Sequence, residues 1–258
     1  MITELLRSDR NGVAWLTLNR PQARNALTMS LMAALDVELA AIADDSAVHV
    51  VVIAGAGPAF CSGHDLREMR ARPQRQAYEE IFGQCSRLML RIVRLPKPVI
   101  ARVHGIASAA GCQLVATCDL GIAADTARFA TPGVDIGLFC STPMVALSRS
   151  IGRKPAMEML LSGEPIDAAK AQALGLVNRV VPEAELDTAV MTLAEHIAGK
   201  SPLTLAIGKE AFYRQAEMPL AHAYAYAAEV MTRNMLARDA EEGIDAFLQK
   251  RPPVWTGT

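Results

Sequence analysis

Aromatic side chains are scarce in this sequence: the 258 residues include only two Trp, four Tyr and six Phe. Hydrophobic residues nevertheless make up 51% of the chain and charged residues 21%, a balance that excludes intrinsic disorder. The core must therefore consist mainly of Ala, Leu, Val, Ile and the twelve Met. A chain of this length corresponds to one or two domains and can bury a large core without disulfides or metals.

The sequence also has no large excess of positive or of negative charge. The 26 basic residues are balanced by 27 acidic ones, so no overall field attracts the protein to nucleic acid or to anionic lipid. No run of about 18 uncharged apolar residues is present, which predicts a protein that does not insert into membranes. The first ten residues carry charges and lack the apolar centre of a signal peptide, so we expect a cytoplasmic location.

Several signatures of other protein classes are absent. The five cysteines form no CxxC pair and the five histidines no HExxH motif, which predicts reduced thiols and no metal site. No GxGxxG follows the first strand and no GxxxxGK[ST] occurs, which excludes the usual dinucleotide and P-loop sites. The GxSxG turn of an α/β-hydrolase is missing as well.

Hydrophobic periodicity predicts an α/β fold. Strands are expected at 13–18, 48–54, 98–103 and 120–124, with helices from Thr28 to about residue 44, over 77–95 and up to Cys118. Strands alternating with helices in this way indicate parallel βαβ units. After about residue 152 the pattern becomes helical, and the segment 219–250 is expected to be helical with a break near Gly243.

Two glycine-bearing turns follow expected strands, at 59–66 and 104–111. Such turns would place free backbone N–H groups at the carboxyl ends of parallel strands, where ligands of open α/β sheets bind. Two N–H groups that converge on one carbonyl oxygen would form an oxyanion hole. The alternative is that the small residues serve only close packing between helix and strand.

The order and spacing of several motifs resemble the crotonase (enoyl-CoA hydratase/isomerase) superfamily. The resemblance covers nearly the whole chain and rests on the segments Asn19-Arg20-Pro21, Arg24 to Leu27, Ala59 to Leu66, His104 to Cys112, Cys118-Asp119, Leu161 to Ile166, Ala173 to Val177, Glu242 to Ile244 and Phe247 to Arg251. It implies a spiral of ββα turns with a C-terminal helical trimerisation region. We therefore expect a spiral core at 1–198 and an oligomerisation region at 199–258.

The resemblance also implies a ligand and an assembly. The substrate would be an acyl-CoA thioester, with CoA as part of the substrate and no separate cofactor, and the protein would be a homotrimer or a dimer of trimers. Carried over residue by residue, the CoA-binding positions are Gln22, Ala23, Arg24, Ser62, Leu66 and Arg67, with Phe247 and Lys250 reaching a neighbouring subunit's CoA. The backbone N–H groups of His64 and Ala110 would form the oxyanion hole for a thioester enolate.

Two glutamates that serve hydratases of this superfamily are replaced here, by Gln113 and Gly133. Hydration needs one group to deprotonate water and another to protonate the α-carbon, and losing such a group typically slows a reaction about 10²–10⁴-fold. We therefore expect ordinary hydratase turnover to be disabled. Gln113 itself stays a candidate catalytic residue, because its amide can hold a water although it cannot usefully exchange a proton. Asp135 and Cys140 are the other candidates, each with a structural alternative: a turn or helix cap for Asp135, and packing for Cys140.

His64 opens a second possibility. The Ser-Gly-His-Asp turn at 62–65 resembles that of methylmalonyl-CoA decarboxylase, a reaction that needs no glutamate pair; a hydrogen bond from His64 to a backbone carbonyl is the structural alternative. The functional hypotheses are thus an acyl-CoA enzyme that stabilises an enolate, a methylmalonyl-CoA-type decarboxylase or thioesterase that uses His64, and a CoA-binding protein without turnover. The segments 139–143 and 250–255 resemble a subgroup that also lacks both glutamates.

Overall fold

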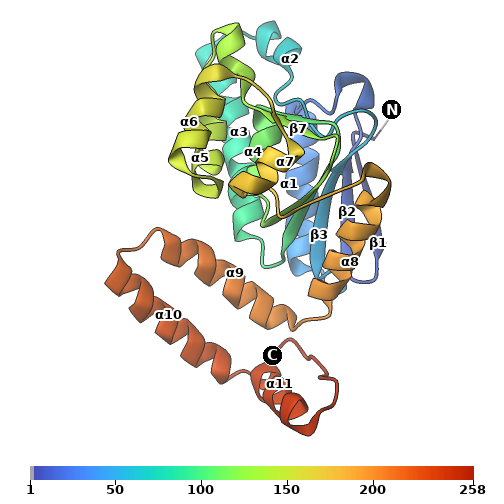
Figure 1. Cartoon of the computed structure of the whole chain (residues 1–258), viewed down its shortest axis with the longest axis vertical. Coiled ribbons are helices and arrows are strands. Elements are labelled where there is room, and N and C mark those ends of the chain that lie inside the picture. The colour runs from blue at the N-terminus through green and yellow to red at the C-terminus, as the bar shows by residue number, and fades with distance from the viewer. Residues whose placement is uncertain (1–2) are drawn as a thin grey trace.

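The computed structural model describes residues 3–258, which form a layered α/β body followed by a row of helices that extends away from it (Figure 1). The expected α/β fold with a helical C-terminal region is confirmed. No helix within residues 3–258 is both long enough and apolar enough to cross a membrane.

The main sheet has six strands in the order β1-β2-β3-β4-β6-β9. Their bounds are Leu5–Arg10, Val13–Leu18, Val50–Gly55, Val99–Val103, Leu120–Ala124 and Arg179–Val181. Only β1 and β2 pair antiparallel, through a tight turn whose residues Asn11 and Gly12 both have positive φ, as short hairpin turns require. The other pairs are parallel, as the βαβ pattern predicts. The edge strand β1 escaped prediction because most of its side chains are exposed.

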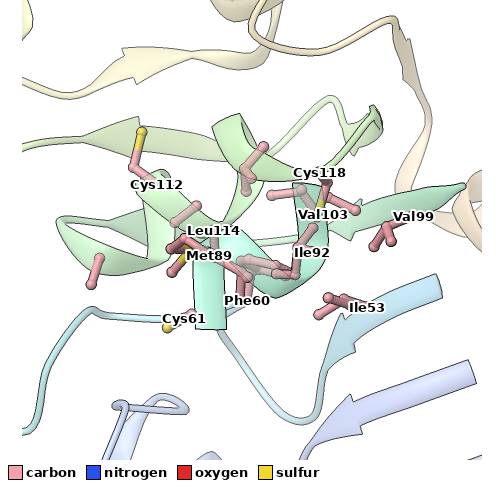
Figure 2. Close-up of a cluster of buried hydrophobic side chains, with 14 of the residues drawn as sticks. Ile53, Phe60, Cys61, Met89, Ile92, Val99, Val103, Cys112, Leu114 and Cys118 are labelled. Atoms are coloured by element: carbon pink, nitrogen blue, oxygen red, sulfur yellow. The ribbon is translucent and has the colours of Figure 1, made fainter. Parts of the chain in front are cut away.

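Both faces of this sheet are buried, which explains its continuous β-branched runs. In β3, Val51 and Ile53 face one hydrophobic cluster, whereas Val50 and Val52 face another. Figure 2 shows the first cluster, where Ile53 and Val103 lie near side chains from the helices that cover that face. The opposite face is covered by α8 (Leu186–Ala198), whose Leu186, Val190 and Ala194 complete the second cluster.

A second sheet of three short strands, β5-β7-β8, stands beside the main one. Its strands are Ile106–Ser108, Arg128–Ala130 and Ile166–Asp167, with β5 and β7 parallel. These strands are only two or three residues long, which is too short for a hydrophobic period to predict them. Strand β5 belongs to the turn after β4, and therefore the small sheet holds that turn in place.

Seven helices accompany the strands of the body before α8. They are α1 (Met29–Asp44), α2 (Leu66–Ala71), α3 (Arg75–Arg94), α4 (Ala110–Thr117), α5 (Ser141–Ser150), α6 (Arg153–Ser162) and α7 (Ala168–Leu174). Three single turns of 3-10 helix lie at Pro21–Ala23 (η1), Pro132–Ile136 (η2) and Glu183–Glu185 (η3). Thr28 caps α1 as predicted, because its Oγ1 accepts a hydrogen bond from the N–H of Leu31 at 3.1 Å.

The C-terminal helices are α9 (Pro202–Ala216), α10 (Leu220–Met235) and α11 (Arg238–Gln249). The expected break near Gly243 is wrong: the chain breaks at Leu236 and Ala237, and Gly243 lies inside α11. The glycine serves packing instead, because a Cβ at this position would stand 3.1 Å from the ring of Trp255.

Helix α9 is fixed to the body by a buried ion pair. Lys209 Nζ lies 2.6 Å from Asp119 Oδ2, and the hydroxyl of Tyr213 donates to Asp119 Oδ1 at 2.8 Å. The N–H of Val99, at the start of β4, donates to the same carboxylate at 2.7 Å. One acidic side chain thus connects the sheet to the first of the three C-terminal helices.

Candidate active site

A cavity of about 1260 Å³ opens where the chain leaves the carboxyl ends of the parallel strands. Its walls come from five separate segments: η1 and the residues around it, the turn at 62–69, Phe82 on α3, residues 108–110 at the start of α4, and the stretch 132–143. The two glycine-bearing turns therefore meet at one cavity, as ligand sites of α/β sheets do. Most of the residues singled out in the sequence line it: His64, Ala110, Asp135, Cys140, Gln22, Ala23, Arg24, Ser62, Leu66 and Arg67, together with Gly133.

The two turns are in direct contact. The N–H of Cys61 donates to Ile106 O at 3.1 Å, and the N–H of Ser108 donates to Cys61 O at 2.9 Å. A Cβ on Gly63 would lie 2.9 Å from the Cβ of Ala109 and 3.2 Å from the nitrogen of Ala110. Close packing thus requires small residues here, and it also brings the backbone beside His64 against that of Ala110.

The N–H groups of His64 and Ala110 lie at the junction of these turns. Leu27 takes the hydrogen bonds on either side of His64: its N–H donates to Gly63 O at 2.8 Å and its carbonyl accepts from Asp65 at 3.0 Å. Ala110 begins α4, where the first N–H groups have no intrahelical acceptor, and its N-cap Ala109 supplies no side-chain acceptor. Among residues 3–258, neither N–H has a hydrogen-bond partner.

Ala109 adopts a strained backbone at this junction. Its φ of 49° and ψ of −115° lie outside the regions that a residue with a Cβ normally occupies. Such conformations typically cost about 1–3 kcal/mol and persist only where surrounding contacts impose them. Here the N–H of Ala109 donates to Ala130 O at 2.9 Å, which ties the junction to β7.

The imidazole of His64 is half-buried at the cavity wall. Its ring meets the ring of Phe82 edge-on, with centroids 5.5 Å apart, and its buried Nε2 has no hydrogen-bond partner within residues 3–258. Burial lowers the pKa of His64 to about 4, so the ring is neutral at physiological pH. The carbonyl contact considered as the structural alternative is not formed by Nε2.

Gln113 lies apart from this cavity. Its side chain is only 4% exposed, its Oε1 accepts a weak hydrogen bond from Cys85 Sγ at 3.9 Å, and it lines a second cavity of about 1340 Å³. Thr142 is the residue that lines both cavities. The structure therefore brings His64 and Ala110 together at the first cavity and places Gln113 at the second.

Gly133 sits in a turn that has closed around it. The N–H of Leu138 donates to Gly133 O at 2.8 Å across η2. A Cβ at position 133 would lie 2.4 Å from the carbonyl oxygen of Leu138 and 2.9 Å from Cys140 Sγ. No side chain fits at this position unless the turn moves, so the residue cannot be exchanged for glutamate in place.

Asp135 and Cys140 flank the same turn. Asp135 is exposed, and its carboxylate stands beside Gly163, whose Cβ would lie 3.0 Å from Asp135 Oδ1. Cys140 is buried, and burial raises the pKa of its thiol, although a hydrogen bond with the backbone of Gly133 opposes this effect. The raised pKa favours packing over nucleophilic attack for Cys140, because the thiolate is the reactive form.

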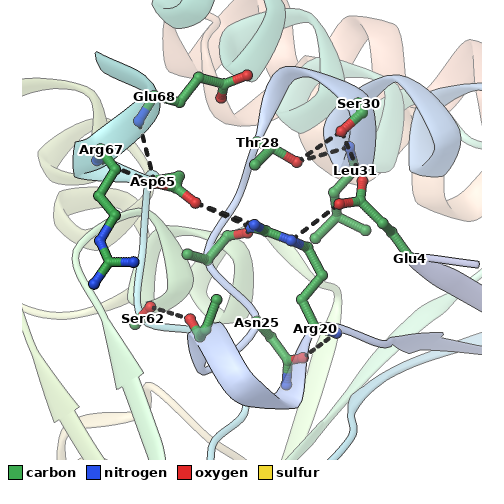
Figure 3. A network of polar contacts seen from close by, with 12 residues as sticks. Glu4, Arg20, Asn25, Thr28, Ser30, Leu31, Ser62, Asp65, Arg67 and Glu68 are labelled. Carbon is green, nitrogen blue, oxygen red and sulfur yellow. Dashed lines mark hydrogen bonds and ion pairs between the residues drawn. The ribbon is translucent and has the colours of Figure 1, made fainter. Parts of the chain in front are cut away.

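The mouth of the cavity is organised by a charged network around Arg20 (Figure 3). Its guanidinium lies 3.0 Å from Glu4 Oε1 and 3.2 Å from Asp65 Oδ2, and it also donates to Ala26 O at 2.6 Å. Asp65 in turn caps α2 by accepting from the N–H groups of Arg67 and Glu68. This network holds η1 against the turn at 62–66. Hydrophobic periodicity could not predict it, because its members are spread over more than sixty residues of the sequence.

The predicted CoA positions divide into two groups. Gln22, Ala23, Arg24, Ser62, Leu66 and Arg67 all lie around the mouth of the cavity, where the Ser62 hydroxyl donates to Ala23 O at 3.4 Å. Phe247 is 82% exposed on α11 and Lys250 ends that helix; neither lines the cavity within the described chain. Residues 3–258 bring no three His, Cys, Asp or Glu side chains together in a way that could hold a metal ion.

Sequence reasoning missed one aromatic residue of the cavity wall. Phe82 on α3 reaches the cavity and supports the ring of His64. Thr131 is fully buried, and its Oγ1 has no hydrogen-bond partner within the described residues. Only the three-dimensional packing identifies Phe82, since this residue occupies no recognisable motif.

Comparisons with known proteins agree with this architecture. The family model described as enoyl-CoA hydratase/isomerase matches residues 8–258. The chain is 47% identical over 246 residues to the human enoyl-CoA hydratase domain-containing protein 3, mitochondrial, covering 95% of this chain and 81% of that protein. It is 38% identical over 257 residues to 2,3-dehydroadipyl-CoA hydratase of Escherichia coli, covering 99% and 100%.

A solved structure gives the same result in three dimensions. The enoyl-CoA hydratase of Mycobacterium smegmatis superimposes with a TM-score of 0.96 at 53% identity, covering 98% of this chain and 99% of that one. The expected crotonase-type fold is thereby confirmed, and the subgroup indicated by segments 139–143 and 250–255 is that of enoyl-CoA hydratase domain-containing protein 3. The chain belongs to the enoyl-CoA hydratase/isomerase family.

Proposed function

We propose that this protein binds an acyl-CoA thioester in the cavity at the carboxyl ends of its parallel strands and stabilises the thioester enolate with the N–H groups of His64 and Ala110. The observation that carries the proposal is the pair of N–H groups without partners at two turns in direct contact. Donors fixed in this way need no reorganisation when negative charge develops on the thioester oxygen. Losing one such donor typically costs about 3 kcal/mol of transition-state stabilisation.

Hydration of an enoyl thioester is not the reaction we propose. The carboxylates that line the cavity are Asp65, Glu68 and Asp135. Asp65 is held by Arg20, Glu68 accepts from the N–H of Met29 at 3.0 Å, and Asp135 lies at the exposed rim. None of them replaces the two family glutamates whose positions are taken by Gln113 and Gly133, so the chemistry differs from that of a hydratase.

A decarboxylase or thioesterase of methylmalonyl-CoA type is the second candidate. Decarboxylation breaks the bond between the α-carbon and the carboxylate, sends its electron pair to the thioester oxygen as an enolate, and releases carbon dioxide; water then protonates the α-carbon. This route needs no protein base. The buried Nε2 of His64, which has no partner within residues 3–258, favours it as a neutral hydrogen-bonding group for the departing carboxylate. In a thioesterase the same nitrogen would orient the attacking water.

A substrate panel separates the candidates. The protein is incubated with crotonyl-CoA, a 3-enoyl-CoA, methylmalonyl-CoA and acetyl-CoA, and the products are followed by mass spectrometry. Isomerised 3-enoyl-CoA supports the first proposal, with Asp135 as the candidate base that takes the α-proton and returns it at C4. Carbon dioxide or free CoA whose release His64→Ala abolishes supports the second. Tight binding of every ester without any product would indicate a CoA-binding protein without turnover. Rapid hydration of crotonyl-CoA would contradict the view that Gln113 and Gly133 disable the hydratase.

The oxyanion hole has its own test. Ala110→Pro removes the N–H of the first residue of α4. Ala110→Gly keeps the N–H and is the matched control. Turnover that falls about 10²-fold in Ala110→Pro but not in Ala110→Gly, with unchanged circular dichroism, supports the role of this donor. Equal activity in the two variants would remove Ala110 from the proposal.

We also propose that the chain assembles into a trimer or a dimer of trimers. Several large apolar side chains on the C-terminal helices are more than half exposed: Phe212, Leu220, Tyr224, Met231, Leu236, Phe247 and Leu248. Exposed apolar side chains in such number are usual at an interface. Light scattering tests the assembly: a monomeric mass would contradict it, and the role of Phe247 and Lys250 at a neighbour's CoA would fall with it.

A cytoplasmic location completes the proposal. Several relatives, including the human protein, are named as mitochondrial, which gives the competing location. A fluorescent fusion of the full chain, expressed in a cell that has mitochondria, distinguishes the cytoplasmic from the mitochondrial location. A signal inside mitochondria would contradict the cytoplasmic proposal.

A further inference from the structure

Helix α11 is held at its start by a buried carboxylate. Asp239 is the second residue of α11 and only 2% exposed, and Ala246 is the other buried residue of that helix. Oδ2 of Asp239 accepts a hydrogen bond from the hydroxyl of Ser201 at 2.6 Å. The same hydroxyl caps α9, because it accepts from the N–H of Thr204 at 3.1 Å. One serine thus joins the start of α9 to the start of α11.

The other donors to Asp239 come from residues 251–258, which follow α11 and which we call the return segment because the chain turns back beside that helix (Figure 1). The N–H and the hydroxyl of Thr256 donate to Asp239 Oδ1 at 2.7 and 3.0 Å, and the N–H of Gly257 donates to Oδ2 at 3.0 Å. The N–H of Asp239 donates in turn to Thr258 O at 3.0 Å. A buried carboxylate that satisfies several donors fixes the segment that supplies them.

Two further contacts fasten the return segment. The Nε1–H of Trp255 donates to Gly199 O at 2.9 Å, at the junction of α8 and α9, and its ring packs against Gly243. Arg251 donates to both carboxylate oxygens of Glu242, at 2.6 and 2.8 Å. The return segment therefore connects α11 directly to the junction of α8 and α9, in addition to the covalent connection through α10.

The far end of α11 carries the two side chains that the proposed assembly directs to a neighbouring subunit. Phe247 is 82% exposed, and Lys250 follows the last turn of the helix. Because a short helix moves as a rigid rod, the position of its last turn depends on how its first turn is held. Asp239 makes the contacts that hold the first turn, so the placement of Phe247 and Lys250 depends on this carboxylate.

We propose that Asp239 is a positioning residue for CoA binding: together with the return segment, it holds α11 so that Phe247 and Lys250 reach the CoA of a neighbouring subunit. The inference rests on the proposed function, in which the chain assembles and CoA lies at the mouth of the cavity. Asp239 lines neither cavity, so its effect on CoA must pass through α11.

A double-mutant cycle tests this coupling. Asp239→Asn keeps the size of the side chain and removes the charge that its donors satisfy, whereas Asp245→Asn makes the same change at an exposed position of α11. Each change is made in the natural chain and in a chain that carries Phe247→Ala and Lys250→Ala. Dissociation constants for CoA are measured by calorimetry on the full chain, and light scattering gives the mass of each sample.

Asp239→Asn should weaken CoA binding about tenfold in the natural chain and less than twofold once Phe247 and Lys250 are replaced, with an unchanged mass. Asp245→Asn should leave CoA binding unchanged in both chains. An equal loss in the two chains, no loss in the natural chain, or a change of mass in Asp239→Asn would overturn the inference while leaving the cavity of the proposed function intact. A natural chain that binds no CoA would instead overturn the proposed function.

A conservative variant of the return segment covers the case in which Asp239→Asn does not fold. Trp255→Phe keeps a ring against Gly243 and removes the hydrogen bond to Gly199 O. It should weaken CoA binding about threefold in the natural chain, as the loss of one hydrogen bond predicts, and should not affect the chain that lacks Phe247 and Lys250. A loss of equal size in both chains would overturn the inference.

Discussion

The guanidinium of Arg102 donates a hydrogen bond to Nδ1 of His104 at 2.6 Å. Because arginine has no acceptor, His104 must be the neutral tautomer that carries its proton on Nε2, and this group donates to Gly57 O at 2.7 Å. The end of β4 is thereby attached to the loop that leads into the turn at 59–66. Arg102 and His104 thus stabilise the approach of the two turns from outside the cavity.

Replacing His104 with alanine should loosen this attachment. A buried hydrogen bond to a carbonyl is lost and Gly57 O is left without its donor, which typically costs about 1–3 kcal/mol of unfolding free energy. Urea denaturation measures the loss. His49→Ala is a suitable comparison because His49 Nδ1 also contacts a carbonyl, Ala198 O at 2.9 Å, far from the cavity. A CoA ester should bind more weakly only to the His104 variant; equal weakening in both would contradict this explanation.

Stability should fall as the pH drops below about 6.5. Burial lowers the pKa of His64 to about 4 and, together with the charge of Arg102, lowers the pKa of His104. A group whose pKa is lower in the folded state than in the unfolded state binds fewer protons in the folded state. Its contribution to the free energy of unfolding is therefore complete above the unfolded pKa and is lost as the pH falls toward the folded pKa. For His64 alone the loss between pH 6.5 and pH 4 is about 3 kcal/mol. Urea titrations of the natural chain and His64→Leu measure it, and parallel pH profiles would contradict it.

The sequence predicted the parallel strands because Val50 to Ile53 are buried on both faces and leave a continuous apolar run. It also located the two turns, since glycine is required where Gly63 and Gly111 approach the opposite backbone. The resemblance then supplied the candidate residues, and the cavity includes most of them.

The remaining features depend on contacts between distant segments. Nothing around Gln113 in the sequence indicates that it faces a second cavity, because that depends on how α3 and α5 pack beside α4. Gly243 lies inside α11, where the ring of Trp255 packs against it from twelve residues away, and the chain breaks at Leu236 instead. The positive φ of Ala109 likewise arises from its bond to Ala130, not from any local preference of alanine.

Ala109→Gly should stabilise the protein. Glycine adopts a φ near 49° without strain, whereas the Cβ of alanine costs about 1–3 kcal/mol there. The greater freedom of glycine in the unfolded chain offsets about 0.5–1 kcal/mol, so a net gain of about 1 kcal/mol is expected. Thermal and urea unfolding measure it. Ala116→Gly, at an ordinary helical position of α4, should destabilise instead, and a loss of stability in both variants would contradict the strain argument.

Restoring the missing carboxylates should not restore a hydratase. Gly133→Glu places a Cβ 2.4 Å from the carbonyl of Leu138, so the turn at 132–138 must open and stability should fall by about 1–3 kcal/mol. Gln113→Glu introduces its carboxylate at the second cavity, whereas His64 and Ala110 line the first. We expect crotonyl-CoA hydration by the double variant to stay within tenfold of the natural chain. An increase of 10³-fold in a coupled dehydrogenase assay would show that only the two carboxylates were missing.

Removing the charge of Lys209 should detach α9 from the body. Its Nζ is held by Asp119, Ile92 O and Lys97 O, and burial lowers its pKa. Lys209→Met leaves the carboxylate of Asp119 buried without its ion pair, a change that typically costs about 3–5 kcal/mol. Arg214→Met breaks the exposed pair with Glu210 on the same helix and should change stability little. Hydrogen exchange should show faster opening of α9 in Lys209→Met alone, since the same rate in both variants would mean that the helix is held by its apolar contacts.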